Sequence, residues 1–164
     1  YPGGRSSFPR ALAPMAGRGD VMFLDCLAGT DLITRNAFMA ADNIVMVLEP
    51  EVPAIRGGAP TRRAIAELEE YLDKHLPVAG WVVNRLILSR GDHAEWLQKI
   101  RELASDDEIP MLGDPITLSA DLARLTVVGM GIDEYRQASP KLRVTAATFK
   151  AIVDGIGASM AVPA

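Results

Sequence analysis

Short, continuous apolar runs alternate along the chain with longer segments whose apolar positions recur three or four residues apart. Three runs are candidate strands, residues 21–24, 44–48 and 78–83, and each is followed by a polar residue or a turn. Residues 109–112 form a shorter fourth candidate. Because the runs are apolar at successive positions, they are typical of parallel strands that are covered on both faces.

Helical periodicity fills the intervals between these runs. We expect helices over residues 31–41, 60–75, 93–104, 118–125 and 140–156. Asp31 can cap the first of these helices, and Pro77 marks the end of the second. Strands that alternate with helices imply right-handed crossover connections. The predicted fold class is therefore α/β, a mostly parallel sheet with helices on both faces.

One domain accounts for most of the chain. Residues 20–158 hold the expected strands and the main helices, and 164 residues are enough for a single hydrophobic core. Residues 1–19 are rich in Gly, Pro, Ser and Arg, so we expect a loop or lead-in with a short helix near 9–16. Residues 159–164 are expected to be a tail.

Composition narrows the class of protein. Apolar residues make up 49% of the chain and charged residues 23%, which is typical of a globular rather than a disordered protein. No apolar run approaches the roughly 20 residues that span a bilayer. No secretion signal is recognisable, so we expect a cytoplasmic protein without an integral membrane segment. Cys26, the single cysteine, is expected to be buried, and His75 and His93 lack a metal-ligand spacing and are expected at the surface.

The charge pattern permits only a local basic patch. A net charge of −4 argues against a wholly basic nucleic-acid module. Four basic residues late in the chain either occupy solvated helix faces or form a patch for non-specific DNA binding. They are Arg136, Lys141, Arg143 and Lys150.

Asp25 directly follows the apolar run 21–24, and Gly29 lies four residues further on. A carboxylate at the carboxyl end of a parallel strand faces the crevice where phosphates and Mg²⁺ bind in P-loop proteins. There Asp25 would hold Mg²⁺, directly or through water, or orient the attacking water. Gly29 would let a backbone N–H approach a γ-phosphate. The alternative is that Asp25 caps the turn and Gly29 only allows it.

The region from Asp25 to Gly57 resembles the switch region of the ParA/MinD family of P-loop ATPases. The family pattern is similar to D-x-x-x-G-T-x-L-x-x-N-A-L-x-A-A-D, followed by a strand and a Pro-Glu stretch. The matching positions are Asp25, Gly29, Thr30, Leu32, Asn36, Ala37, Ala40, Ala41, Asp42, Pro50, Glu51, Ala54 and Gly57. Leu27-Ala28 departs from the family, which usually has proline just before the glycine.

Later segments extend this resemblance. Asn84 and Arg85 end a run similar to the family's G-x-x-x-N-R element, in which the Asn amide contacts the adenine edge. An amide suits that role because it offers a donor and an acceptor together, although Asn84 could instead only cap the turn that ends the strand. Pro115 lies in a segment similar to the loop that packs against the base. The resemblance thus implies ATP and Mg²⁺ as cofactors.

The phosphate-binding loop is missing from this sequence. No Gly-x-x-x-x-Gly-Lys-Ser/Thr occurs in the 164 residues. Without the backbone cradle and the lysine of that loop, little remains to hold the β- and γ-phosphates. We therefore expect the C-terminal portion of a ParA-like ATPase, P-loop NTPase-like but incomplete at the N-terminus, that does not hydrolyse ATP alone.

The leading functional hypothesis is a partition or positioning ATPase for plasmid or chromosome segregation. The resemblance implies an ATP-dependent homodimer, a partner protein that stimulates the ATPase, non-specific DNA binding and association with the nucleoid. The alternative is a non-catalytic scaffold of the pilus-assembly CpaE/TadZ type. A metabolic relative that uses the same fold for ATP-dependent ligation, similar to dethiobiotin synthetase, is a third possibility.

Overall fold

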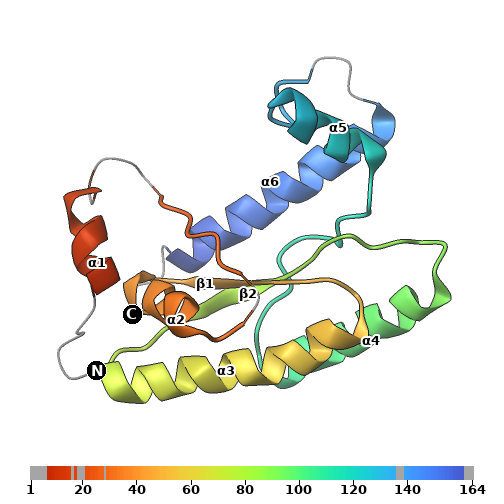
Figure 1. The fold of residues 1–164 in the computed structure, drawn as a ribbon. Helices are drawn as coiled ribbons and strands as arrows, with labels where there is room; N and C mark the ends of the chain where they lie inside the picture. Colours follow the sequence, from red (N-terminus) through yellow and green to blue (C-terminus); the bar gives the residue numbers. More distant parts are fainter. Residues whose placement is uncertain (1–6, 16, 18–20, 28, 136–138, 161–164) are drawn as a thin grey trace. The chain divides into compact units, whose positions relative to one another are not determined.

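The structure is a computed structural model that describes residues 7–15, 17, 21–27, 29–135 and 139–160, with only the backbone for residues 7 and 52–57 (Figure 1). The chain divides into two compact units. The first unit takes in the described residues up to 44 and residues 55–77, and the second takes in residues 45–54 and the described residues from 78 onward.

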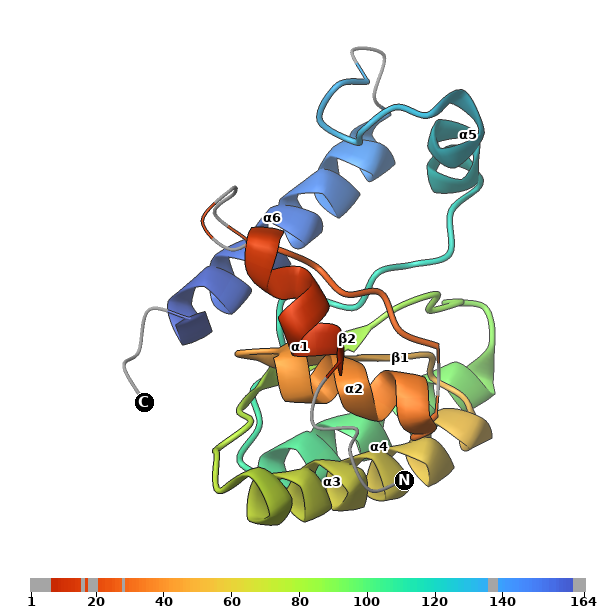
Figure 2. The same cartoon turned by 60° about the vertical axis from the view of Figure 1, so that its left-hand side comes forward.

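Helices build the first unit. It contains α1 (Ser7–Leu12), the short 3-10 helix η1 (Ala13–Met15), α2 (Leu32–Ala40) and most of α3 (Val52–Leu72). α1 packs against α2 (Figure 2). Leu32, the first residue of α2, is 74% exposed, but most other apolar positions with helical spacing along these helices are buried. They include Ala37, Phe38, Ala64, Ile65 and Leu68.

Asp31 caps α2, as predicted. Its carboxylate accepts a hydrogen bond from the backbone N–H of Thr34 at 2.8 Å. This contact satisfies one of the N–H groups that a helix start leaves without an intrahelical partner. The hydrogen bond also lowers the pKa of the Asp31 carboxyl below its ordinary value of 3.8.

Replacing Asp31 by alanine should lower the Tm of the protein by about 2–4 °C at pH 7. Since the folded-state pKa of Asp31 is lowered, the cap stabilises the folded protein above the ordinary carboxyl pKa, and this contribution disappears as the pH falls through the folded value. Calorimetry between pH 7 and pH 3 should therefore show the difference from wild type shrinking. Asp31→Asn keeps an acceptor that does not titrate and is the matched control. A difference that stays constant down to pH 3 would contradict this account of the cap.

The second unit carries the sheet. β1 (Ile44–Leu48) and β2 (Val78–Val83) are hydrogen-bonded parallel neighbours with the bounds that their apolar runs predict. The predicted fourth strand pairs with the other edge of β2 through one isolated parallel bridge, Trp81 with Met111, and a second bridge, Leu86 with Thr117, joins the segments that follow. The N–H of Leu112 donates to the carbonyl of Trp81 at 2.8 Å. The run at 109–112 therefore lies where a parallel strand would lie, without forming a continuous one.

Gly80 permits the close approach of this segment to β2. A Cβ at position 80 would lie 2.5 Å from Cγ of Leu112 and 2.7 Å from the carbonyl oxygen of Pro110. Both distances are far below van der Waals contact, so any larger residue must displace the neighbouring backbone. The pairing of β2 with residues 110–112 therefore requires glycine at position 80.

Helices cover both faces of this sheet, as predicted. α6 (Pro140–Met160) packs on β2, and α4 (Gly91–Asp106) lies on the opposite side of β2 in both views (Figures 1 and 2). α5 (Ala120–Val128) precedes α6 in the chain. The core between β2 and α6 consists of Val82, Leu112, Ile116, Ile152 and Ile156. α6 includes the first two residues of the expected tail, and residues 161–164 lie outside the described residues.

Residues 21–27 do not form the buried strand that was predicted. They carry no regular secondary structure, and Phe23 and Leu27 are 70% and 85% exposed. A strand is stable only when its backbone N–H and C=O groups pair with a neighbouring strand. Among the described residues none pairs with this segment. Cys26 is likewise exposed rather than buried, and its thiol donates to the carbonyl of Leu24 at 3.6 Å.

α3 begins earlier than predicted. The sequence pattern predicts that this helix starts near Pro60. In the structure the helix begins at Val52 and Pro60 lies inside it, where it has no N–H to donate to the preceding turn. None of the helices in the described part of the chain is long and apolar enough to cross a membrane.

Candidate functional site

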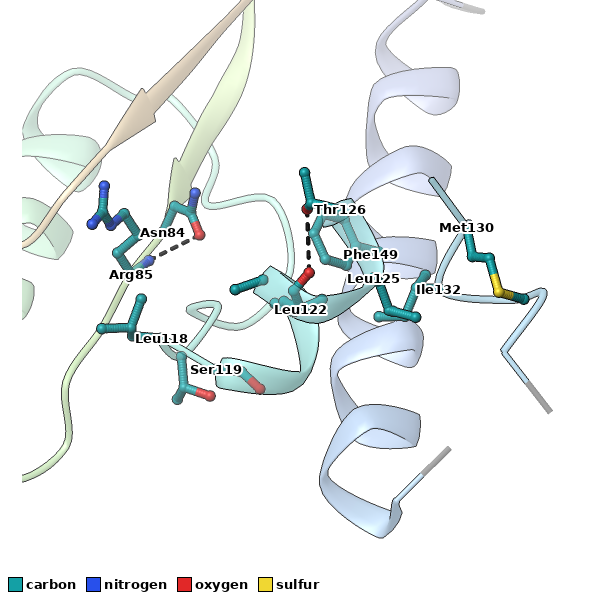
Figure 3. Close-up of a pocket in the computed structure, with 12 residues that line it drawn as sticks. Asn84, Arg85, Leu118, Ser119, Leu122, Leu125, Thr126, Met130, Ile132 and Phe149 are labelled. Carbon is teal, nitrogen blue, oxygen red and sulfur yellow. Dashed lines mark hydrogen bonds between the residues drawn. The ribbon is translucent and has the colours of Figure 1, made fainter. Parts of the chain in front are cut away.

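An open pocket of about 680 Å³ lies at the carboxyl end of β2 (Figure 3). Its volume is in the range of small-molecule binding sites. The walls come from the end of β2, from the segment that leads into α5, from α5 and from α6. The lining residues are Asn84, Arg85, Thr117, Leu118, Ser119, Leu122, Ala123, Leu125, Thr126, Met130, Ile132 and Phe149.

Asn84 and Arg85 form the polar end of this pocket. Asn84 follows the last residue of β2, and its backbone N–H donates to the carbonyl of Leu48 in β1 at 2.8 Å. Its side-chain Oδ1 accepts the backbone N–H of Arg85 at 2.9 Å (Figure 3). Arg85 adopts a left-handed backbone conformation with φ of 58°, which is unfavourable for a residue other than glycine. The hydrogen bond from the Arg85 N–H fixes the orientation of the Asn84 side-chain amide.

Apolar side chains form most of the remaining wall. Leu122 and Leu125 project from α5 and Phe149 from α6, with Ile132 between the two helices in the sequence. Apolar walls with a few oriented polar groups are typical of small-molecule binding sites.

Hydrogen bonds at the start of α6 hold the two helical walls together. The hydroxyl of Ser139 donates to Oδ2 of Asp121, in the first turn of α5, at 3.2 Å. The hydroxyl oxygen of Ser139 also accepts the N–H of Leu142 at 3.2 Å and so caps α6. At the other end of α5, Gly129 ends the helix with a left-handed φ of 66°. These contacts fix both ends of α5 and the start of α6, the two helices that form the walls of the pocket.

The other residues expected to bind nucleotide are not among those that line this pocket. Asp25 and Gly29 belong to the first unit, and both are exposed. Gly29 has a φ of 141°, which side-chain-bearing residues rarely adopt, so the turn depends on glycine. Partial removal of the exposed Cys26 thiol from water, and then the negative charges of Asp25 and Asp31, raise its pKa. Pro115 is half-buried on the segment before α5 and does not line the pocket, whereas Thr117, two residues later, does.

The basic residues proposed for DNA binding do not share one surface in the described part of α6. Lys141, Arg143 and Lys150 are all exposed. At about 100° per residue, Arg143 and Lys150 share a face and Lys141 lies on the opposite side. The ammonium of Lys150 also pairs with Asp154 at 2.6 Å. Arg136 lies outside the described residues.

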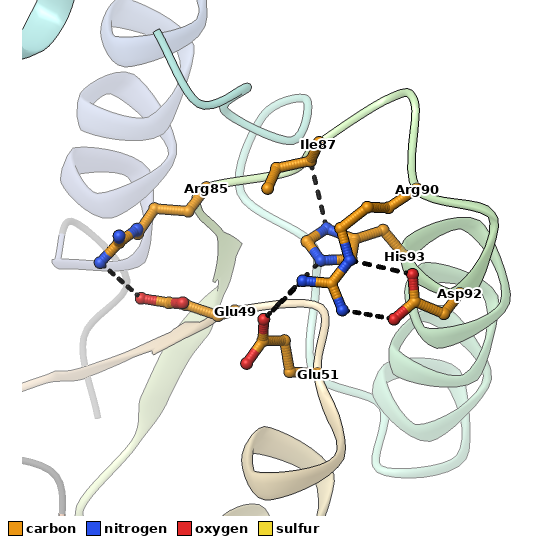
Figure 4. Close-up of polar contacts among 7 residues, drawn as sticks. All are labelled: Glu49, Glu51, Arg85, Ile87, Arg90, Asp92 and His93. Atoms are coloured by element: carbon orange, nitrogen blue, oxygen red, sulfur yellow. Dashed lines mark hydrogen bonds and ion pairs between the residues drawn. The ribbon is translucent and has the colours of Figure 1, made fainter. Parts of the chain in front are cut away.

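His93 is buried, although the sequence predicted a surface residue. Only 2% of it is exposed, and its Nδ1 accepts the backbone N–H of Ile87 at 3.1 Å (Figure 4). The signal was present in the pattern, since His93 precedes Trp96 and Ile100 by three and seven residues and lies on the apolar stripe of α4. Two acidic residues that follow β1 contact the same loop: Glu49 pairs with Arg85 at 3.3 Å, and Glu51 with Arg90 at 3.1 Å.

No group of three or more His, Cys, Asp or Glu side chains that could hold a metal ion occurs among the described residues. A Mg²⁺ ion at Asp25 would therefore need further ligands from a nucleotide or from water, as is usual for Mg²⁺ in nucleotide sites.

Comparison with known proteins gives relatives that are longer than this chain. No family model matches the sequence. An uncharacterized protein of Mycobacterium tuberculosis, present in two strains, is 25% identical over 128 residues, which cover 70% of this chain and 40% of that protein. Two similar solved structures are of cobyrinic acid a,c-diamide synthase from Mycobacterium smegmatis. The one with a bound ATP analog and magnesium has a TM-score of 0.59 and 25% identity, covering 76% of this chain and 55% of that one. The one with bound ADP and magnesium has a TM-score of 0.64 and 22% identity, covering 91% and 51%.

These comparisons confirm the predicted fold class. The fold is α/β and P-loop NTPase-like, and the structural neighbours are a P-loop ATPase of the ParA/MinD-like class. The chain spans about half of the solved structures and 40% of the M. tuberculosis protein.

Proposed function

We propose that the pocket at the carboxyl end of β2 binds the adenine base of ATP, in an ATP-using protein of the ParA/MinD-like class. Asn84 contacts the base edge in this proposal, with Arg85 beside it in the pocket and Pro115 on the segment before α5, two residues from the lining residue Thr117. Asp25 holds Mg²⁺ directly or through water, and Gly29 brings a backbone N–H to the γ-phosphate.

The fixed amide of Asn84 is the observation that carries this proposal. Adenine presents an acceptor, N1, beside a donor, N6, so Nδ2 of Asn84 can donate to N1 while a lone pair of Oδ1 accepts from N6. Guanine presents the reverse pattern and would need the amide turned over. The N–H of Arg85 holds Oδ1 at 2.9 Å and opposes that reversal. The pocket is therefore expected to prefer adenine to guanine.

Equilibrium binding tests the proposal. Isothermal titration calorimetry on the full natural protein that contains this chain should give saturable binding of ATP and ADP in the presence of Mg²⁺. The same titration with GTP should give an affinity at least about fivefold weaker, because one mispaired edge costs roughly 1–3 kcal/mol. Absence of adenine nucleotide binding would refute the proposal.

Within this class we propose a partition or positioning ATPase, supported by the in-register matches from Asp25 to Gly57. A homodimer, a partner protein that stimulates the ATPase and association with the nucleoid belong to this finer proposal. An ATP-dependent synthase is the second candidate, favoured by the solved neighbours. The non-catalytic CpaE/TadZ-type scaffold would bind or dimerise without turning over ATP.

The full natural protein should be retained on non-specific DNA only with ATP, and retention should fall by about 10³-fold or more between 50 and 200 mM salt if six or more phosphates are contacted. Arg143→Ala should weaken retention, whereas Lys141→Ala on the opposite face of α6 is the matched control. A synthase would instead consume ATP only when its small-molecule acid is added. ATP-independent or salt-insensitive retention would contradict the partition role.

A further inference from the structure

We propose that His93 is a positioning residue for the pocket. In its neutral form it fixes the loop that leaves β2 at Asn84 and Arg85, and a second proton on its ring releases that loop. The effect on ligand binding rests on the proposed function, whereas the effect on the loop does not.

The contacts of His93 join α4 to the loop before it (Figure 4). Nδ1 accepts the N–H of Ile87 at 3.1 Å, and the N–H of His93 itself donates to the carbonyl of Arg90 at 3.2 Å. The N–H of Arg90 in turn donates to the carbonyl of Ile87 at 3.1 Å. His93 therefore closes a ring of hydrogen bonds around residues 87–93, from a side chain that is 98% buried, since only 2% of it is exposed.

These contacts determine where the ring carries its proton. Because Nδ1 accepts a hydrogen bond it has no hydrogen, so the neutral ring is protonated on Nε2. Nε2 is buried and has no hydrogen-bond partner among the described residues. Oε1 of Glu51 is 3.8 Å away, too far for a hydrogen bond. The ring thus has one satisfied and one unsatisfied nitrogen.

Three charged side chains surround this nitrogen and the start of α4. Glu51 faces Nε2 and also accepts from Nη1 of Arg90 at 3.1 Å, while Arg90 pairs with Asp92 in the first turn of α4. The hydrogen bond from Arg90 is the main cause of the lowered pKa of Asp92. Two carboxylates and one guanidinium leave a negative environment that can accept an imidazolium.

A second proton would change which contact His93 makes. Protonated Nδ1 is a donor, so it can no longer accept the N–H of Ile87 and instead opposes it. The charged ring gains attraction to Glu51 at the same time. Ile87 lies two residues after Arg85, and the intervening Leu86 N–H remains bonded to the carbonyl of Ile116 at 2.9 Å. Protonation thus frees the loop immediately beyond the polar end of the pocket.

Amide hydrogen exchange of Ile87 tests the loop directly. In the wild-type protein, protection of Ile87, corrected for the intrinsic pH dependence of exchange, should fall about tenfold or more from pH 8 to pH 5.5. His93→Asn places an amide oxygen near the position of Nδ1 and does not titrate, so protection should stay constant in that variant. His75→Gln, at the exposed second histidine, should behave as wild type. Constant protection in the wild type, or an equal loss in His93→Asn, would overturn the proposal.

The dissociation constant of ADP tests the positioning role. From pH 8 to pH 5.5 it should rise several-fold more in the wild type than in His93→Asn, a comparison that cancels the titration of the nucleotide phosphates. Equal changes in the two proteins, with Ile87 released only in the wild type, would overturn the positioning role. If ADP binds neither protein at any pH, the proposed function fails, whereas the exchange of Ile87 still decides whether His93 holds the loop.

Discussion

Replacing Gly80 by alanine should lower the free energy of unfolding by about 2–3 kcal/mol, at the upper end of what one added methyl group costs in a packed site. The new Cβ would lie 2.5 Å from Cγ of Leu112 and 2.7 Å from the carbonyl oxygen of Pro110. That carbonyl is part of the backbone and accepts the N–H of Trp81 at 2.9 Å. Relief of the clash must therefore lengthen the hydrogen bonds that join β2 to residues 110–112.

Urea denaturation followed by circular dichroism measures this loss. Gly157→Ala is the matched control, because position 157 lies in α6 and a Cβ there would meet nothing within 4 Å. In a helix, replacing glycine by alanine should be neutral or stabilising by up to about 1 kcal/mol. Equal effects of the two substitutions would show that the segment 110–112 does not pack on β2 as described.

Replacing Asn84 by alanine should weaken ADP binding by about 10- to 100-fold, because two hydrogen bonds to the base edge are lost. Asn84→Asp should weaken ADP binding as well, since a carboxylate only accepts and would face N1 of adenine. The same carboxylate can accept from N1–H of guanine, so the ratio of GDP to ADP affinity should rise in this variant. Calorimetric titration of both nucleotides measures the two effects.

Gln98→Ala is the control for Asn84→Ala, because Gln98 lies on α4 outside the pocket and its amide contacts Glu102. Both substitutions remove an amide, but only the first should change nucleotide affinity. Unfolding curves of each variant separate loss of binding from loss of structure, since Asn84 also accepts the N–H of Arg85. Unchanged ADP affinity in a folded Asn84→Ala protein would contradict the assigned role.

The sheet of the second unit was predictable because its signal is local. β1 and β2 are continuous apolar runs that end at a polar residue, and each forms a strand with the predicted bounds. The same pattern failed at residues 21–24, because an apolar run becomes a strand only when another strand supplies its hydrogen bonds. The local apolar pattern thus predicts which segments can form strands, and pairing with a neighbouring strand determines which of them do.

The pocket was predictable only at its polar end. Asn84 and Arg85 follow a strand and carry recognisable chemistry, so the sequence indicated them. Leu122, Leu125 and Phe149 are ordinary apolar residues of two helices, and nothing in their spacing indicates that they face a cavity rather than the core. The loop contact of His93 also depends on three-dimensional structure, because Ile87 and His93 meet only once the loop turns back onto α4.

Nuclear magnetic resonance with ADP added to labelled protein tests the central claim most directly, because it locates the base. If the base binds at the carboxyl end of β2, the side-chain amide of Asn84 and the methyl groups of Leu122, Leu125 and Ile132 should shift together as the pocket fills. Saturable ADP binding that leaves these four signals unchanged would contradict the account.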